Sequence, residues 1–169
     1  MNILWAPWRV GYVMGPKDEG CFLCEAPAAG DDHGRLVLYR SRRVYIILNS
    51  FPYNSGHVMV APLRHVARPE DLDPEERLDL MDTLALATRV LQAALRPEGF
   101  NVGLNLGRAA GAGIEQHLHV HVVPRWTGDT NFMPVLAAVK VLPEHLAATY
   151  EKLREALAAD QPGRSGGRP

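Results

Sequence analysis

Short apolar runs and helical apolar repeats follow one another along this chain, and together they predict its elements. Runs of β-branched and other apolar residues predict five strands, at Leu36–Arg40, Val44–Asn49, His57–Pro62, Phe100–Leu106 and Gln116–Pro124. Ser41-Arg42-Arg43 separates the first two runs, so these two strands are expected to form a hairpin.

Two segments have the spacing of amphipathic helices. The first begins with Asp73 as N-cap, Pro74 at the first helical position and Glu76 at N3, a capping-box arrangement, and Pro97 ends it after about Arg96. The side chains expected to face a sheet are Leu78, Met81, Leu84, Ala85, Thr88, Leu91 and Leu95. The segment from Val139 onward is expected to end in a second helix, which Pro143 opens. Its apolar face consists of Leu146, Tyr150, Leu153 and Leu157.

The order of these elements predicts the fold class. Strands follow one another in a run, with a long helix after the third and another helix at the end, which is typical of an α+β fold with a mainly antiparallel five-stranded sheet. A chain of 169 residues is long enough for one domain with a sizeable core. We assign residues 1–159 to that domain, with an N-terminal arm over 1–20 that carries Trp5, Trp8 and Tyr12. Residues 160–169, rich in Gly, Pro and Arg, are expected to be a disordered tail.

The fifth strand holds the most informative pattern in the chain, a histidine at every second position. Side chains alternate between the two faces of a strand, so His117, His119 and His121 are expected to line one face about 6–7 Å apart. The apolar residues between them point to the other face. Imidazoles packed in a core would each need a hydrogen-bond partner. The pattern therefore favours a metal or phosphate site over a plain polar face on an edge strand.

Composition narrows the ligands and the location. The formal net charge of −1 gives no general attraction to nucleic acid or to an anionic membrane, so a phosphate-bearing ligand needs a local site. Apolar runs are far shorter than a membrane span and the first residues lack the order of a signal peptide, so we expect a cytoplasmic location. The two cysteines, Cys21 and Cys24, leave three hypotheses open: a metal clip, a redox pair or two idle thiols.

Three blocks of the sequence resemble the histidine triad (HIT) family of nucleotide hydrolases and transferases, and they occur in that family's order. The blocks are Asn49 with Gly56–Pro62, then Asn105-Leu106-Gly107 with Ala110–Ile114, and finally the triad itself. The continuation Pro124–Phe132 is similar to the bacterial branch that cleaves diadenosine polyphosphates. The blocks span roughly residues 21–134, so the resemblance implies the histidine triad fold for most of the chain.

The resemblance implies roles for three histidines. His119, the middle histidine, would be the nucleophile that attacks the α-phosphorus and then carries a nucleotidyl group. A hydrogen bond from its other ring nitrogen to a backbone carbonyl would fix the tautomer. His121 and His57 would donate hydrogen bonds to phosphate or leaving-group oxygens. The alternative for His57 is a strand-entry residue that is hydrogen-bonded to a loop.

The same resemblance implies nucleotide contacts from two asparagines. Asn49 would contact the ribose and Asn105 would face the phosphates, while ordinary turn chemistry is the alternative for both. Leu48, Ile46 and Phe22 are candidates for a wall against the base, with plain core packing as the alternative.

A small-residue loop before the triad is the second phosphate-side candidate. Its residues are Gly111, Ala112, Gly113 and Ile114. Many family members have Ser or Thr where this chain has Ile114. Backbone N–H groups of the loop are therefore expected to bind phosphate instead, because small residues let the backbone approach an anion closely.

The C-x-x-C pair is expected to bind structural zinc. Some histidine triad proteins and the related galactose-1-phosphate uridylyltransferases complete such a site with a His after the third strand and the first triad His. In this sequence the four ligands would be Cys21, Cys24, His65 and His117. Zinc at this position would clip the N-terminal segment to the sheet. Two buried reduced thiols, with His117 hydrogen-bonded to the backbone, are the alternative.

We therefore expect an enzyme that cleaves dinucleoside polyphosphates, in particular diadenosine tetraphosphate by phosphorolysis, through a nucleotidyl-histidine intermediate. A nucleoside phosphoramidase is the second hypothesis, and a metal- or nucleotide-binding module without turnover is the third. The implied partners are the nucleotide substrate, inorganic phosphate and a second copy of the chain, with no nucleic acid and no membrane. The long helix is a candidate dimer surface.

Overall fold

The structure is a computed structural model that describes residues 20–130 and 142–160. The predicted N-terminal arm, with Trp5, Trp8 and Tyr12, lies outside the described residues except for its last residue. The predicted tail likewise lies outside them except for Asp160. The assignment of residues 1–159 to one domain stays a prediction.

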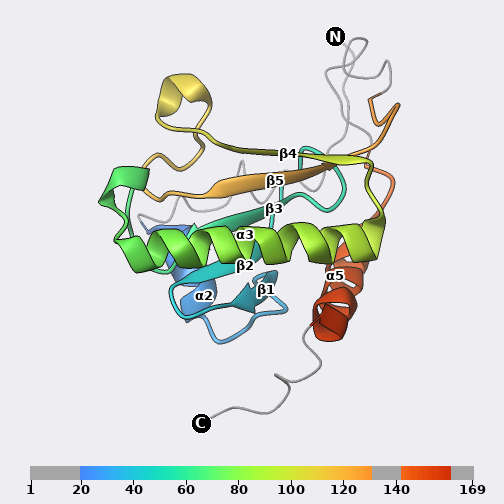
Figure 1. Ribbon diagram of the computed structural model, residues 1–169, viewed down its shortest axis with the longest axis horizontal. Helices are drawn as coiled ribbons and strands as arrows, with labels where there is room; N and C mark the ends of the chain where they lie inside the picture. The colour runs from blue at the N-terminus through green and yellow to red at the C-terminus, as the bar shows by residue number, and fades with distance from the viewer. Residues whose placement is uncertain (1–19, 131–141, 161–169) are drawn as a thin grey trace.

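A five-stranded antiparallel sheet forms the centre of the molecule (Figure 1). Its strands are β1 (Val37–Arg40), β2 (Val44–Leu48), β3 (Val58–Pro62), β4 (Gly99–Leu104) and β5 (Val120–Arg125). Their order across the sheet is β1-β2-β3-β5-β4, and each neighbouring pair is antiparallel. The predicted α+β class, the five strands and the hairpin of β1 and β2 are confirmed.

Helices cover both faces of the sheet. The long helix α3 (Pro74–Leu95) crosses one face, with α5 (Leu146–Asp160) beside it, and the short helix α2 (Phe22–Ala28) lies on the other face (Figure 1). Two 3-10 turns, η2 (Pro69–Asp71) and η3 (Arg108–Ala110), interrupt the connections. The face that carries α2 is the face of the histidines, because His121 pairs with Met59 and Met59 packs in the apolar cluster under α2.

The predicted start of α3 is confirmed in detail. Asp73 Oδ1 accepts a hydrogen bond from the amide of Glu76 at 2.7 Å, and Glu76 Oε2 accepts one from the amide of Asp73 at 2.9 Å. This reciprocal pair satisfies two amide groups that helical geometry leaves unpaired. Arg64 adds two further hydrogen bonds to the Glu76 carboxylate, at 2.8 and 2.6 Å. The helix start is thereby tied to the loop that follows β3.

The predicted sheet-facing stripe of α3 is wrong in part. Its exposed members are Leu78, Met81 and Ala85, and the first two expose 64% and 61% of their surface. The residues that α3 buries are Glu76, Thr83, Leu86, Ala87, Val90 and Leu91. Apolar residues occur on two sides of this helix, and the periodicity alone did not distinguish the side that meets the sheet.

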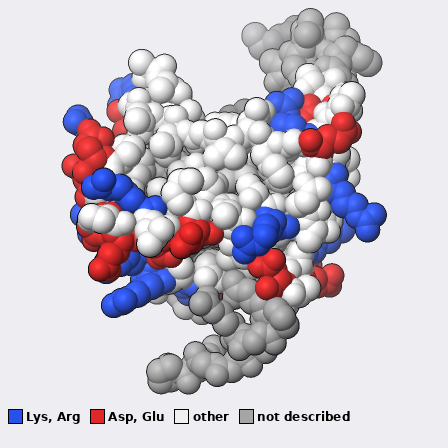
Figure 2. Space-filling model, viewed as in Figure 1, with Lys and Arg blue, Asp and Glu red and all other residues white. Residues whose placement is uncertain are grey.

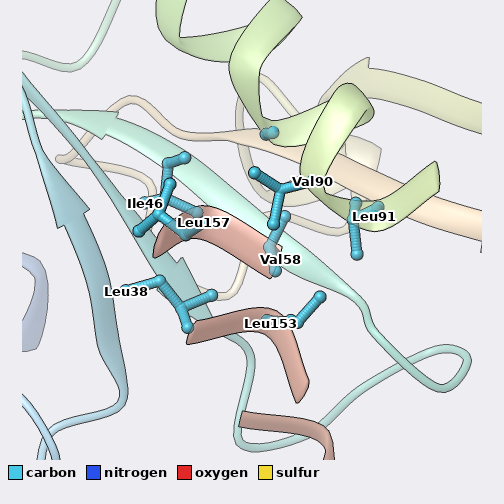
Figure 3. A pocket seen from close by; sticks show the side chains of 8 residues that line it. Leu38, Ile46, Val58, Val90, Leu91, Leu153 and Leu157 are labelled. Carbon is cyan, nitrogen blue, oxygen red and sulfur yellow. The ribbon is translucent and has the colours of Figure 1, made fainter. Parts of the chain in front are cut away.

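Below α3, side chains from three layers fill the main core. Figure 3 shows Leu38, Ile46 and Val58 of the sheet, Val90 and Leu91 of α3, and Leu153 and Leu157 of α5 around a common point. The apolar cavity among them measures about 10 Å³, which is room for one water molecule at most. This cavity is a packing gap and is too small for a substrate.

The fifth strand begins later than predicted. Regular pairing starts at Val120 rather than at Gln116. The residues before it bond to other parts of the chain: the Leu118 amide donates to the Val66 carbonyl at 2.6 Å, and the His117 ring is hydrogen-bonded to the Pro62 carbonyl at 2.8 Å. These contacts draw the segment toward the loop that follows β3, away from the sheet ladder.

The last helix also begins later than predicted, at Leu146. Pro143 does not open it, because the first turn is organised by His145, whose ring nitrogen and carbonyl accept from the amides of Ala147 and Thr149. The predicted apolar face of this helix does meet the core. Within residues 20–130 and 142–160, no helix is both long enough and apolar enough to cross a membrane.

The ion pair of Glu76 and Arg64 yields a pH-dependent stability prediction. Hydrogen bonds from Arg64 lower the pKa of Glu76 to about 2. A carboxyl whose pKa falls on folding stabilises the folded chain above its ordinary pKa, and this contribution disappears as the pH falls toward about 2. We expect Glu76→Gln to lower the free energy of unfolding by about 1–2 kcal/mol at pH 7, a discounted figure because Arg64 is half exposed.

Denaturant titrations of Glu76→Gln and wild type at pH 7, 4 and 2.5 measure this difference, which should shrink at each step. Glu75→Gln is the matched control, because Glu75 is exposed and pairs only at the surface with Arg43. An equal difference at pH 7 and pH 2.5 would mean that side-chain shape, not charge, carries the effect.

Candidate active site and metal centre

Three of the predicted catalytic histidines form one buried cluster at the meeting point of β3 and β5. His57, His119 and His121 expose 0%, 7% and 9% of their surface. The ring centroids of His57 and His121 lie 5.1 Å apart, and those of His119 and His121 lie 4.9 Å apart. The structure therefore brings together side chains that are up to 64 residues apart in the chain.

The backbone fixes the proton on His119. Its Nδ1 lies 2.8 Å from the carbonyl oxygen of His117, and because a carbonyl can only accept, Nδ1 carries the hydrogen and donates it. In a neutral imidazole the other nitrogen, Nε2, then has a lone pair. His119 is thus held as the tautomer that a nucleophile requires.

A second hydrogen-bond chain fixes His57 and His121. The amide of Tyr53 donates to His57 Nδ1 at 3.0 Å, so His57 carries its hydrogen on Nε2. That Nε2 lies 3.0 Å from His121 Nδ1, which must accept. The hydrogen of His121 is therefore on Nε2. His57 therefore donates its ring hydrogen to His121, and His121 keeps its Nε2–H for another acceptor.

Burial keeps His121 neutral. Loss of solvent is the main cause that lowers the pKa of His121 to about 4, and nearby His119 adds to the effect. At neutral pH this ring is an uncharged hydrogen-bond donor and acceptor. A neutral His121 ring is the form that the hydrogen-bond chain from Tyr53 through His57 requires.

The two predicted asparagines flank this cluster. The side-chain amide nitrogen of Asn49 lies 3.4 Å from His57 Nδ1, which accepts, and that of Asn105 lies 3.4 Å from His121 Nε2. Because this Nε2 carries a hydrogen, it bonds to Asn105 when the amide is turned so that its oxygen faces the ring. Asn49 also has the turn role that was its alternative, because its Oδ1 accepts from the Phe51 amide at 2.8 Å. Both asparagine side chains therefore lie beside the histidine rings, and Asn49 in addition shapes the turn before Phe51.

The phosphate-side loop offers fewer amide groups than the sequence suggested. The amides of Gly111 and Ala112 already donate to the carbonyls of Arg108 and Gly107 within the loop. In the part of the chain that the structure describes, the amides of Gly113 and Ile114 make no such bond. The Ile114 side chain packs against the apolar cluster under α2. Gly113 and Ile114 are therefore the residues of this loop whose backbone amides remain candidates for a contact with an anion.

Two of the three candidates for a base wall are on the wrong face. Ile46 and Leu48 pack in the core under α3, whereas the histidines lie on the opposite face with Met59. Phe22, at the start of α2, exposes 43% of its surface on the histidine face. Plain core packing accounts for Ile46 and Leu48.

Sequence reasoning missed three residues beside the cluster. The ring of Tyr53 lies over those of His57 and His121, with centroids 4.6 and 5.6 Å away. Asn54 and Asp129 hold the loop that carries Tyr53 onto the end of β5. The only signal in the sequence was their position in segments that flank His57 and the triad, since Asn54 meets Asp129 and Pro124, at least 70 residues away, only in the folded chain.

The four predicted metal ligands meet in one group. Ligand atoms of Cys21, Cys24, His65 and His117 all lie within 4.8 Å of one another. Both sulfur atoms lie 3.3 Å from His117 Nδ1, and Cys24 Sγ lies 3.2 Å from His65 Nδ1. Sulfur and nitrogen ligands of a tetrahedral zinc are about 3.5 Å apart. Among the residues described here, no other such group was found.

The His117 ring has the protonation that a metal ligand needs. Its Nε2 donates to the Pro62 carbonyl at 2.8 Å, so Nδ1 has its lone pair toward the cysteines. Burial lowers the pKa of His117, and the hydrogen bond to Pro62 opposes this only in part. The donor set of two thiols and two imidazoles, in this arrangement, fits a closed structural metal site.

Comparison with known proteins agrees with this geometry. The model of the HIT domain matches residues 33–128. Over 159 residues the chain is 44% identical to AP-4-A phosphorylase of Mycobacterium tuberculosis, which covers 89% of this chain and 81% of that protein. It is 31% identical over 129 residues to the asymmetrical bis(5'-nucleosyl)-tetraphosphatase of Schizosaccharomyces pombe, with 76% and 70% of the two chains covered.

A solved structure with a similar fold contains zinc. A zinc-bound histidine triad family protein from Mycobacterium smegmatis matches with a TM-score of 0.67 and 26% identity, over 86% of this chain and 98% of that chain. The domain match covers more than half of the sequence, and the strand order and histidine cluster agree with it. The chain therefore belongs to the histidine triad (HIT) family.

Proposed function

We propose that this protein is an enzyme that cleaves dinucleoside polyphosphates, with diadenosine tetraphosphate as substrate and inorganic phosphate as acceptor. The observation that carries the proposal is the 2.8 Å hydrogen bond from His119 Nδ1 to the His117 carbonyl, which leaves a lone pair on Nε2 of a buried histidine. The relatives named as a phosphorylase and a tetraphosphatase support this substrate class.

In the first step, His119 Nε2 attacks the α-phosphorus. A nitrogen–phosphorus bond forms, the bond from that phosphorus to the bridging oxygen breaks, and ATP leaves. The Nε2–H group of His121 is the donor for the charge that develops on the phosphate oxygens or on the leaving oxygen, and His57 orients this donor through its hydrogen bond to His121 Nδ1. Because the tautomers are set before substrate binds, no proton has to be rearranged at that moment.

In the second step, an oxygen of inorganic phosphate attacks the adenylyl group on His119. The oxygen–phosphorus bond forms, the nitrogen–phosphorus bond breaks, and ADP is released with His119 restored. The amides of Gly113 and Ile114 are the candidates for the phosphate contact, because they have no partner inside the loop as the structure describes it. Asn49 is assigned to the ribose and Asn105 to the phosphates.

The geometry disfavours the module without turnover. A metal bound by the three triad histidines would need three ligand atoms that point to one place. Instead the His117 ring faces the cysteines, His119 Nδ1 bonds to the backbone, and His121 Nδ1 is paired with His57.

Zinc is the metal we propose for the group of Cys21, Cys24, His65 and His117. Two thiolates and two imidazoles are ligands that zinc prefers in closed sites, and the metal supplies a crosslink without redox chemistry. It would join the residue before α2, the loop after β3 and the start of the triad segment. The zinc-bound relative supports this choice.

We further propose that the active protein is a homodimer. Val102 and Leu104 of the edge strand β4 pair with Val122 and Val120, so they stand on the α3 side of the sheet, where α3 covers β2, β3 and β5 instead. They expose 47% and 39% of their surface. Figure 2 shows an area without charged side chains that extends from α3 toward β4. A second chain would cover this area and the open edge.

The function is tested with chromatography of products from diadenosine tetraphosphate. We expect ATP and ADP, formed much faster with millimolar phosphate present. His119→Ala should lower the rate at least about a thousandfold while the melting temperature stays close to wild type. His33→Ala, an exposed histidine paired with Glu151, should be unaffected. ATP and AMP at a phosphate-independent rate would contradict phosphorolysis, and preference for an adenosine phosphoramidate would contradict the substrate class.

The zinc site is tested by metal analysis of protein purified without added zinc or chelator. We expect about one zinc per chain, because the four ligands form one tetrahedral set. Cys24→Ser should lose the metal and melt at least about 5 °C lower, since binding to the folded state alone adds stability. Glu25→Gln changes the neighbouring residue on α2, and this variant should keep the metal and the wild-type melting temperature. A metal-free wild type would rule the site out.

The dimer is tested by light scattering during gel filtration. Leu104→Glu should halve the mass in solution, because it places a charge in the apolar area on β4. Ala159→Glu adds the same charge at an exposed position of α5 and should leave the mass unchanged. A monomeric wild type at micromolar concentration would contradict the proposal.

A further inference from the structure

The carboxylate of Asp129 lies in the turn after β5 and collects hydrogen bonds from two directions. Its side chain exposes 7% of its surface. Within the turn it accepts from Arg125 Nε at 2.6 Å, from a second Arg125 nitrogen at 2.8 Å and from the Trp126 amide at 3.2 Å. From the other direction Asn54 Nδ2 donates to it at 2.8 Å. A buried carboxylate that accepts this many hydrogen bonds can occupy only a narrow range of positions.

Asn54 links this turn to the loop before His57. Its side chain is buried and also donates to the Pro124 carbonyl at 3.0 Å, while its own carbonyl accepts from the His57 amide at 3.1 Å. The close approach of this loop requires glycine at position 56, because a Cβ there would lie 2.3 Å from Leu95 and 3.3 Å from Pro124. The loop is thereby pressed onto the end of β5.

Held in this way, the loop places the backbone amide of Tyr53 against the ring of His57. That amide donates to His57 Nδ1 at 3.0 Å, and it is a shorter contact than the one from Asn49 Nδ2 to the same nitrogen, at 3.4 Å. Donors at Nδ1 direct the hydrogen of His57 to Nε2, which faces His121. If the loop moved away, the longer contact with Asn49 would hold the hydrogen on Nε2 less firmly, and a shift to Nδ1 would become easier. His57 would then present a lone pair toward His121 Nδ1, and His121 would lose the donor that keeps its own hydrogen on Nε2.

We propose that Asp129 is a positioning residue: through Asn54 it holds the Tyr53 amide on His57 and so fixes the tautomer of His57. The effect on turnover rests on the proposed function, whereas the effect on the His57 ring does not. The hydrogen bonds from Arg125 hold the pKa of Asp129 well below its usual range, so the carboxylate keeps its charge at all pH values at which the enzyme is expected to work.

The test compares ring nitrogen NMR spectra of His57 in the full, metal-loaded chain. In wild type we expect one tautomer, with the hydrogen on Nε2. Asp129→Asn removes the charge at nearly constant shape, and Asn54→Ala removes the link itself. Both should give a mixture of tautomers or exchange-broadened signals. Thr127→Val is the matched control, because Thr127 lies in the same turn but bonds to Glu98 instead of Asn54.

Kinetics supply the second measurement. Asp129→Asn and Asn54→Ala should each lower kcat about tenfold to a hundredfold with a much smaller change in KM, because a donor is misplaced while the binding groups remain. The double variant should be no slower than the slower single variant, since both act through one link. If Asp129→Asn does not fold, the His57 spectrum and the kcat of Asn54→Ala test the positioning role on their own.

A folded Asp129→Asn variant with an unchanged His57 spectrum would overturn the proposal, and so would additive losses of kcat in the double variant. Absence of dinucleoside polyphosphate cleavage in wild type would contradict the proposed function alone. The spectra of His57 would still decide the positioning role in that event.

Discussion

The hydrogen bond between His119 Nδ1 and the carbonyl of His117 is the contact on which the site depends. It is 2.8 Å long, and it determines that the lone pair of a buried imidazole is on the nitrogen opposite the backbone. Since a carbonyl oxygen only accepts, the neutral ring carries its hydrogen on Nδ1 as long as this bond is made. Nucleophilic chemistry at His119 therefore requires that the main chain at His117 be held still.

Three separate contacts hold His117. Its Nδ1 faces both cysteines at 3.3 Å, its Nε2 donates to Pro62, and its carbonyl accepts from His119. The group of Cys21, Cys24, His65 and His117 is thus joined to the histidine cluster through His117, and the proposed metal crosslink in the first would also restrain the second. The loop before His57 is held in a parallel manner by the turn after β5. Both supports attach the site to segments far away in the sequence.

Local patterns predicted most of the fold because local physics determines it. Alternating and β-branched runs placed the strands to within a few residues, and the cap at Asp73 was readable because its partners are three residues apart. Patterns failed where distant partners compete. His117 and Leu118 leave the ladder for Pro62 and Val66, and α3 carries apolar side chains on two sides. The candidate histidines came from spacing and resemblance, whereas the loop contacts of Tyr53 and Asn54 depend on tertiary structure alone.

During turnover, His119 Nε2 should become covalently bound to phosphorus. The most direct measurement is peptide mass spectrometry of enzyme that is mixed with diadenosine tetraphosphate in phosphate-free buffer, denatured within milliseconds at alkaline pH and digested. We expect an adenylyl group on the peptide that contains residues 117–121, with fragmentation that assigns it to His119, and its disappearance when phosphate is added before denaturation. An adduct on His57 or His121, or turnover at full rate with no adduct at any time point, would contradict nucleophilic attack by His119.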